Sequence, residues 1–73
     1  MERIELNPDV CNGKPVVKGT RITVQTVLSY LSAGDSVDDV LRGHPRLSRE
    51  DVLACLEYAR KLSDVHTTVR LAS

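Results

Sequence analysis

The chain of 73 residues has no tryptophan, no phenylalanine and only two tyrosines, Tyr30 and Tyr58. A core built from this composition must be aliphatic, packed from valine, leucine, isoleucine and alanine side chains. A chain of this length buries only about 60% of the surface that its unfolded form exposes, so such a core is marginal by itself. Burial against a second polypeptide is one way in which small domains gain the missing stability.

The chain also lacks an excess of charge of either sign. Ten Lys and Arg side chains are balanced by ten Asp and Glu side chains, and the isoelectric point is near 6.7. Proteins that are held to nucleic acid by bulk charge need clustered Lys and Arg to neutralise phosphates. This composition therefore does not favour a protein that binds nucleic acid through net charge.

Long hydrophobic runs are missing as well. No apolar run approaches the roughly 18 residues needed to span a bilayer. The first residues do not show the charged and apolar regions of a signal peptide. We therefore expect a cytoplasmic protein that has no membrane partner.

Cysteine and histidine are too few and too scattered to predict a metal site. Cys11 and Cys55 show no Cys-x-x-Cys spacing, and His44 and His66 have no second ligand three or four residues away. Such residues do not assemble a tetrahedral zinc site. We expect no metal and no cofactor, with two buried free thiols favoured over one disulfide, and with His44 packed at a helix end.

The sequence also shows no arrangement of residues that is typical of a catalytic site. Asp38 and Asp39 are adjacent, so their side chains diverge by about 100° on a helix, and acids in a first turn are explained by the helix dipole. The run Gly13-Lys14-Pro15 lacks the serine or threonine of a phosphate-binding loop. With no catalytic residues to name, we predict that the protein is not an enzyme.

The organisation of the chain changes near Thr23, where turn residues give way to apolar residues at helical spacing. Residues 1–22 contain short alternations of polar and apolar side chains between turn signals, which predicts a β and turn segment. Gly13 and Gly19 are expected to take positive φ in its turns. The apolar residues of its expected strands are Ile4, Leu6, Val16, Val17 and Ile22.

Three helices are predicted after this segment. Thr23, Ser36 and Ser48 each offer a hydroxyl to the free N–H groups of a first helical turn, and Gly34 offers a left-handed stop. The expected helices run over Val24–Ala33, from Ser36 to the Gly43-His44-Pro45 sequence, and from the Ser48 cap to Leu62. Residues 63–73 are weakly patterned, and we expect a frayed or partner-dependent tail there.

Three short helices with a tight turn between the last two predict a mainly α fold. We expect a homeodomain-like, helix-turn-helix bundle over residues 23–62 with a short N-terminal β element, all in one domain. Between Ser48 and Leu62 three bases are balanced by three acids, and Glu50 and Asp51 stand at the end that usually meets base edges. The bundle is therefore better suited to be a packing scaffold than a DNA reader.

A specific resemblance covers nearly the whole chain. The run NPDVCNGKPVVKGTRITV, from Asn7 to Val24, resembles the opening signature of the domain-of-unknown-function 433 family. The similarity continues through Ser32-Ala33-Gly34, Ser36–Leu41 and His44–Val52. Members are small bacterial and archaeal proteins with a helix-turn-helix-like core, and some are regarded as antitoxins paired with PIN-like nuclease toxins. The resemblance implies an antitoxin of a toxin–antitoxin system with a PIN-like toxin as its protein partner.

The basic residues of the N-terminal segment are the candidate partner contacts. Lys14, Lys18 and Arg21 form, with Arg3, the local basic excess of the chain. The alternative is that these basic residues form a solvated face or make ion pairs with nearby acids of the same chain. Because arginine presents a rigid fork to carboxylates, we hypothesise that Arg21 reaches the acidic metal ligands of the nuclease.

Two further interactions are predicted. Short edge strands tend to pair with another chain, so we expect the strand residues to pair across a twofold axis and form a homodimer. Those residues are Ile4, Leu6, Val16, Val17 and Ile22.

The sequence thus favours a non-catalytic interaction module, and the alternative is a DNA-binding transcriptional autorepressor. The residues of that alternative are Arg46, Arg49 and Arg60.

Overall fold

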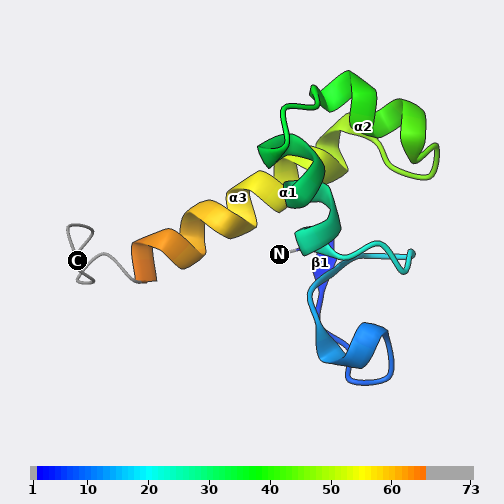
Figure 1. The fold of residues 1–73 in the computed structure, drawn as a ribbon. Helices are drawn as coiled ribbons and strands as arrows, with labels where there is room; N and C mark the ends of the chain where they lie inside the picture. Colours follow the sequence, from blue (N-terminus) through cyan, green and yellow to red (C-terminus); the bar gives the residue numbers. More distant parts are fainter. Residues whose placement is uncertain (1, 66–73) are drawn as a thin grey trace.

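The computed structural model describes residues 2–65, which form three helices and a small sheet. In chain order the elements are β1 (Ile4–Glu5), the 3-10 turn η1 (Cys11–Gly13), β2 (Val16–Val17), α1 (Val24–Ser32), α2 (Val37–Gly43) and α3 (Arg49–Val65). Figure 1 shows α1 and α2 gathered around the first part of α3, with β1 close to the start of α1. The predicted mainly α fold with a short N-terminal β element is confirmed.

The sheet is completed within the chain. β1 and β2 pair antiparallel, with Ile4 opposite Val17. On its other side β2 meets the segment before α1, because the Val17 N–H donates to the Ile22 carbonyl at 2.9 Å and Val16 bridges to Thr23. The second strand therefore has neighbours on both sides inside one copy of the protein.

The turns around β2 contain four residues with positive φ, and two of them, in the turn between the strands, were not predicted from the sequence. Gly13 and Gly19 have φ values of 80° and 81°, as expected, but Cys11 and Asn12 are also left-handed, at 50° and 59°. A left-handed cysteine is uncommon, whereas asparagine tolerates this region. The Cys11 Sγ–H donates to the Arg21 carbonyl at 3.3 Å, so the turn is fastened to the loop that precedes α1.

Each helix starts on the predicted hydroxyl. The Thr23 and Ser36 side chains accept from backbone N–H groups of α1 and α2. Ser48 and Asp51 exchange two side-chain to backbone hydrogen bonds of 3.0 and 3.2 Å at the start of α3, the reciprocal arrangement of a capping box. Gly34, at φ 105°, follows the end of α1.

The third helix is longer than the sequence predicts. It continues to Val65 rather than ending at Leu62, so the first three residues of the expected tail are helical. The rest of that tail, 66–73, lies outside the described residues. Within residues 2–65, no helix combines the length and apolar content that a bilayer crossing requires.

The core is aliphatic, as the composition requires. Its side chains come from all three helices and from both strands, so the sheet packs on the helices as part of one cluster. The buried members are Ile4, Val17, Val24, Val27, Val40, Leu47, Val52 and Cys55. Together they hold the first half of α3 against α1, α2 and β1.

Candidate interaction surfaces

The apolar stripe of α3 extends beyond the core that it helps to form. α3 has 17 residues and so spans about 26 Å, whereas α1 and α2 have nine and seven. Val52 and Cys55 have 0% exposure, but Leu62, farther along the same stripe, is 46% exposed. Figure 1 shows this second half of α3 projecting past the other helices. Within residues 2–65, the helix thus offers apolar surface that the other elements do not cover.

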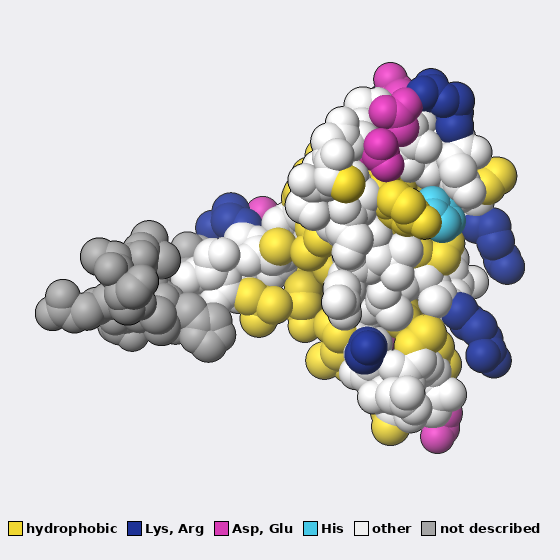
Figure 2. All heavy atoms as spheres, in the orientation of Figure 1, with side chains coloured by type: hydrophobic (Ala, Val, Ile, Leu, Met, Phe, Trp, Pro, Cys, Tyr) yellow, Lys and Arg dark blue, Asp and Glu magenta, His cyan; other side chains and the backbone are white. Residues whose placement is uncertain are grey.

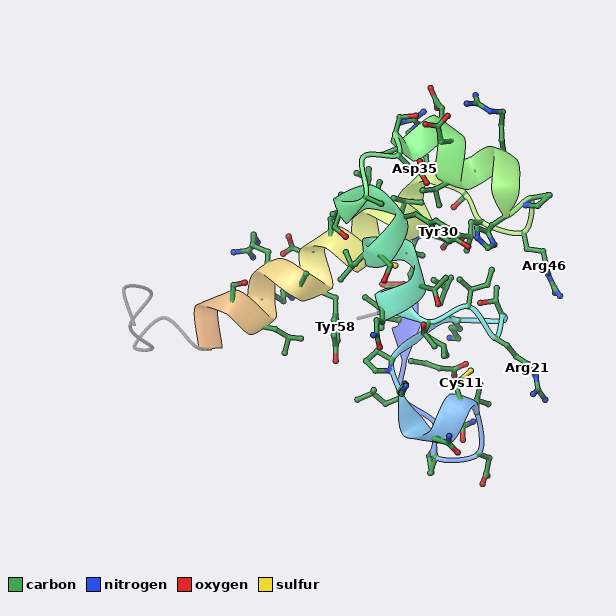
Figure 3. The ribbon with its side chains drawn as sticks, viewed as in Figure 1. Cys11, Arg21, Tyr30, Asp35, Arg46 and Tyr58 are labelled. Atoms are coloured by element: carbon green, nitrogen blue, oxygen red, sulfur yellow. The ribbon has the colours of Figure 1, made fainter. Side chains whose placement is uncertain are left out.

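A groove follows this exposed part of the stripe. We call it the α1–α3 groove: a hollow of about 520 Å³ between α1, the second half of α3 and the segment before β2. Its apolar lining consists of Pro15, Val24, Leu28, Tyr58, Ala59 and Leu62. Figure 2 shows hydrophobic side chains gathered where α3 leaves the core, and Figure 3 shows Tyr58 extending from α3 toward the N-terminal segment.

A second face of α3 also exposes leucine. Leu53 is 52% exposed and Leu56 is 40% exposed. Leu53 and Leu62 are nine residues apart, which places them on opposite sides of the helix at about 100° per residue. Leu53 does not line the α1–α3 groove. The two leucines are therefore matched in exposure but differ in face.

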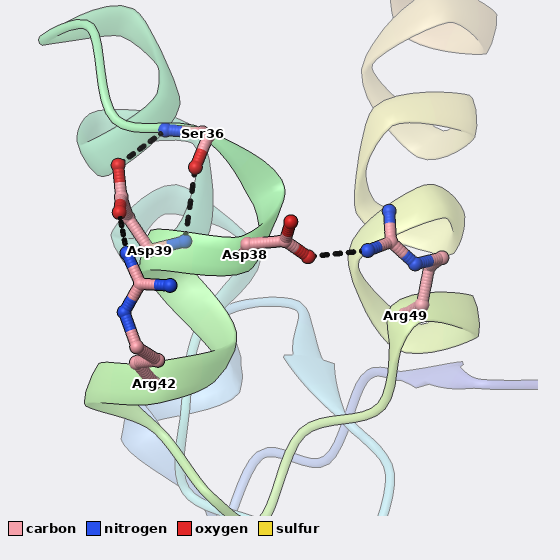
Figure 4. Close-up of polar contacts among 5 residues, drawn as sticks. All are labelled: Ser36, Asp38, Asp39, Arg42 and Arg49. Carbon is pink, nitrogen blue, oxygen red and sulfur yellow. Dashed lines mark hydrogen bonds and ion pairs between the residues drawn. The ribbon is translucent and has the colours of Figure 1, made fainter.

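Four arginines are held by acids of the same chain. The ion pairs are Arg3–Asp51 at 3.0 Å, Arg60–Glu57 at 2.7 Å, Arg42–Asp39 and Arg49–Asp38. The last of these connects α3 to α2, as Figure 4 shows, while the first connects the N-terminal segment to α3. Arg49 and Arg60, two of the three residues proposed for DNA contact, therefore already have acidic partners.

These contacts change the titration of the acids. The Ser36 backbone N–H, followed by its hydroxyl, holds the pKa of Asp39 below its usual value. The hydrogen bond from Arg60 does the same for the pKa of Glu57. Burial raises the pKa of Asp51, but hydrogen bonds from Ser48 and Arg3 outweigh it and leave that pKa lowered. All three carboxyl groups are thus stabilised in their charged form.

The two cysteines are free thiols, as predicted, although Cys11 is only half-buried. Burial, together with the nearby charge of Asp51, raises the pKa of the Cys55 thiol to about 11. A thiol that stays protonated at neutral pH is a poor nucleophile and a poor metal ligand. Across residues 2–65, no three His, Cys, Asp or Glu side chains come together in a metal-binding group.

His44 lies at the end of α2, as expected, and its ring packs on that of Tyr30. Its ring centroid is 5.3 Å from that of Tyr30, at an angle of 50°. Its backbone N–H donates to the Val40 carbonyl as the helix ends. His66, the other histidine, lies outside the described residues.

Arg21 and Arg46 remain open to a partner. Both are exposed, and within the described part of the chain neither forms an ion pair. Both line a second hollow, of about 550 Å³, which we call the arginine hollow. Figure 3 shows the two side chains extending outward from the same side of the molecule. They are 25 positions apart in the sequence, so no local pattern predicts this pairing.

The predicted basic trio is not gathered at one place. Lys14 lines the α1–α3 groove, whereas Arg21 lines the arginine hollow. Lys18 is exposed at the end of β2 and lines neither hollow. The structure thus separates Lys14 from Arg21 and brings Arg21 together with Arg46, a residue that the sequence associates with the DNA alternative.

The strand residues predicted for a homodimer are largely buried inside one copy. Ile4 is 6% exposed, Val16 0% and Val17 1%, and Ile22 is half-buried. Leu6 is the exception, at 65% exposure. Three of the five side chains are therefore already covered without a second copy, and a homodimer stays a prediction.

Comparison with known proteins identifies the family. Residues 4–59 match the family described as "Protein of unknown function (DUF433)". The chain is 38% identical over 58 residues to "Uncharacterized protein y4eO" of Sinorhizobium fredii (strain NBRC 101917 / NGR234), a match that covers 80% of this chain but 26% of that protein.

A solved structure agrees with the sequence comparison. The crystal structure of a DUF433 member protein from Anabaena variabilis ATCC 29413 is similar to this fold, with a TM-score of 0.77 and 32% identity. That match covers 81% of this chain and 58% of the other, so the chain spans less than two thirds of either relative. By sequence and by fold, the chain belongs to the DUF433 family.

Proposed function

We propose that the chain is a non-catalytic interaction module, an antitoxin-like protein that binds a PIN-like nuclease. The α1–α3 groove is the main contact in this proposal, and an apolar helix or strand end of the nuclease fills it. A cytoplasmic location follows from the same proposal, because a toxin that cleaves cellular RNA acts in the cytoplasm and its antitoxin binds it there. The role of the nuclease rests on the family resemblance, and the surface rests on the geometry of α3.

One observation carries the proposal. The stripe that is fully buried at Val52 and Cys55 continues to Leu62 with 46% exposure. Exposed apolar surface next to a well-formed groove is characteristic of a protein-binding site. Leu62 and its neighbours in the groove therefore provide the burial that a domain of this size needs from a partner.

The alternative is a DNA-binding autorepressor, and the observations favour it less. Arg49 and Arg60 are engaged in ion pairs, and the solvent side of α3 carries Leu53 and Leu56. Base readout needs polar side chains that reach base edges. Duplex DNA of about 20 base pairs, titrated at several salt concentrations, tests this alternative, because phosphate contacts give a steep negative salt slope.

Co-expression with the protein encoded by the neighbouring open reading frame tests the proposal directly. If that protein is a PIN-like nuclease, we expect a stoichiometric complex on size-exclusion chromatography and loss of its ribonuclease activity in the complex. Separate elution with unchanged ribonuclease activity would contradict the proposal.

A pair of leucine substitutions locates the contact. Leu62→Arg places a charge in the α1–α3 groove and should weaken the complex by at least about tenfold, the effect of removing one well-buried anchor. Leu53→Arg makes the same change at a similarly exposed position on the opposite face and should leave the affinity within about twofold. Equal effects of the two variants would show that the groove is not the contact.

A further inference from the structure

The arginine hollow has a composition that distinguishes it from a phosphate site. Its walls include Arg21, Arg46, the half-buried apolar side chains of Val10 and Ile22, and the carboxyl-bearing Glu5. A phosphodiester of a nucleic-acid backbone carries one negative charge and is flanked by sugars, which offer little apolar surface. A carboxylate carries one charge and, in a polypeptide, has apolar neighbours along the chain. The walls therefore match an acidic peptide better than a nucleic-acid backbone.

The guanidinium groups suit the same ligand. Arginine forms paired, parallel hydrogen bonds with a carboxylate, and its weak hydration eases burial at an interface. Arg60 forms such a pair with Glu57, through its Nε at 2.9 Å and a terminal nitrogen at 2.7 Å, whereas Arg42 and Arg49 each make a single contact with an aspartate. Arg21 and Arg46 have the same chemistry, and among residues 2–65 neither forms an ion pair with an acid.

The loop that carries Arg21 is fixed before any ligand arrives. The Thr20 hydroxyl donates to the Val17 carbonyl at 2.8 Å and accepts from the Ile22 N–H at 3.0 Å. The Arg21 carbonyl accepts from the Cys11 thiol at 3.3 Å. A preorganised loop loses less conformational entropy on binding, which favours a specific contact.

The loop that carries Arg46 is also anchored. Its neighbour Leu47 is buried in the core, at 6% exposure, and the Leu47 N–H donates to the His44 carbonyl at 2.9 Å. The two arginines therefore extend from rigid supports that belong to different parts of the chain. Their joint position is a property of the fold.

We propose that the arginine hollow binds carboxylate side chains of a partner protein, within a segment that alternates acidic and apolar residues. This inference rests on the proposed function only in that the segment belongs to the partner that fills the α1–α3 groove. It adds a second, charge-based contact on another side of the molecule and assigns it to Arg21 and Arg46 together.

A peptide titration tests the site without the nuclease. The probe is an acetylated and amidated pentapeptide of alternating leucine and glutamate, added to the full ¹⁵N-labelled chain at low salt. We expect amide shifts confined to residues 19–22 and the neighbourhood of Arg46. The same peptide with glutamine in place of glutamate should bind at least about fivefold more weakly, since the charge-assisted bonds are lost.

Variants assign the contact to the two arginines. Arg21→Gln and Arg46→Gln should each weaken peptide binding by about two- to fivefold, and together by about tenfold, as for exposed ion pairs. Lys61→Ala, which removes a charge from an exposed position on α3, should leave peptide binding unchanged. Glu5→Gln should strengthen binding of the acidic peptide by about twofold, because it removes a like charge from the hollow.

Three results would overturn the site: unchanged binding by the double arginine variant, equal binding of the glutamine peptide, or tighter binding of a 12-base-pair duplex with shifts at the same residues. The last would assign the hollow to phosphates. Failure of the site and failure of the proposed function are distinguishable. Leu62→Arg should weaken the nuclease complex by at least about tenfold yet bind the acidic peptide normally, whereas the double arginine variant should bind the peptide about tenfold more weakly.

Discussion

The two halves of α3 have similar apolar patterns but different surroundings. In the first half, Val52 and Cys55 have no exposed surface and pack with residues of α1, α2 and β1. In the second half, Leu62 keeps nearly half of its surface exposed beside the α1–α3 groove. The comparison teaches that amphipathic spacing identifies which face of a helix is apolar, but not which polypeptide covers it.

The largest expected effect comes from comparing two variants, each with an arginine substitution in one half of α3. Val52→Arg would bury an unpaired charge, which costs about 3–5 kcal/mol. A core of this size supplies about as much in total, so this variant should be unfolded by circular dichroism at 25 °C. Leu62→Arg should change the free energy of unfolding by less than about 0.5 kcal/mol, because the side chain is exposed. Similar stabilities of the two variants would remove the distinction between the halves.

A smaller effect concerns the cap that anchors the first half. Asp51 accepts from the Ser48 N–H and from Arg3, so Asp51→Asn should reduce the free energy of unfolding at pH 7 by on the order of 1 kcal/mol. Urea unfolding monitored by circular dichroism measures this. Glu50→Gln, at an exposed position in the same turn, is the control and should have little effect.

The same carboxylate predicts a pH dependence with a definite sign. The native pKa of Asp51 lies below its usual value of 3.8, so the unfolded state binds a proton at higher pH than the native state. Its stabilisation is therefore complete above about pH 4 and is lost as the pH falls through the native pKa. Asp51→Asn should flatten the acid side of the stability curve. If the stability of Asp51→Asn fell at acid pH as steeply as that of the unsubstituted chain, the role given to the Asp51 carboxylate in the cap would be contradicted.

The rate of alkylation at Cys55 also sharpens the comparison between the two halves. Its burial, and the raised pKa of about 11, should slow alkylation by iodoacetamide at pH 8 at least about a hundredfold relative to a cysteine peptide. The measurement uses mass spectrometry in a Cys11→Ser background. Val52→Ala, which opens the packed half more often, should speed labelling about tenfold. Leu62→Arg should leave the labelling rate of Cys55 unchanged. If it accelerated labelling as much as Val52→Ala does, the claim that the two halves of α3 are independent would be contradicted.

Local signals in the sequence predicted the elements well. Thr23, Ser36 and Ser48 cap their helices where the hydroxyl pattern placed them, because capping depends on a few adjacent residues. The short β element was also predicted, from alternation and turn residues. The left-handed Cys11 was not, since its conformation is supported by a contact with Arg21, ten residues away.

The surfaces were less predictable than the elements. Arg46 and Arg49 look equivalent in the sequence, but Arg49 is paired with Asp38 of another helix while Arg46 lines a hollow with Arg21. Likewise, Leu62 lies seven positions after the buried Cys55, which is the spacing of a core residue, yet it is 46% exposed. Burial and pairing depend on tertiary contacts between distant positions, which periodicity does not report.

Amide hydrogen exchange along α3 tests the central claim most directly. In the free chain, amides of residues 58–62 should exchange much faster than those of 52–56, because few tertiary contacts support the second half. Adding the co-expressed nuclease should slow residues 58–62 at least about tenfold while residues 52–56 change little. Equal exchange in 58–62 with and without a stoichiometric nuclease partner would contradict the claim that this half of the helix is a protein-binding surface.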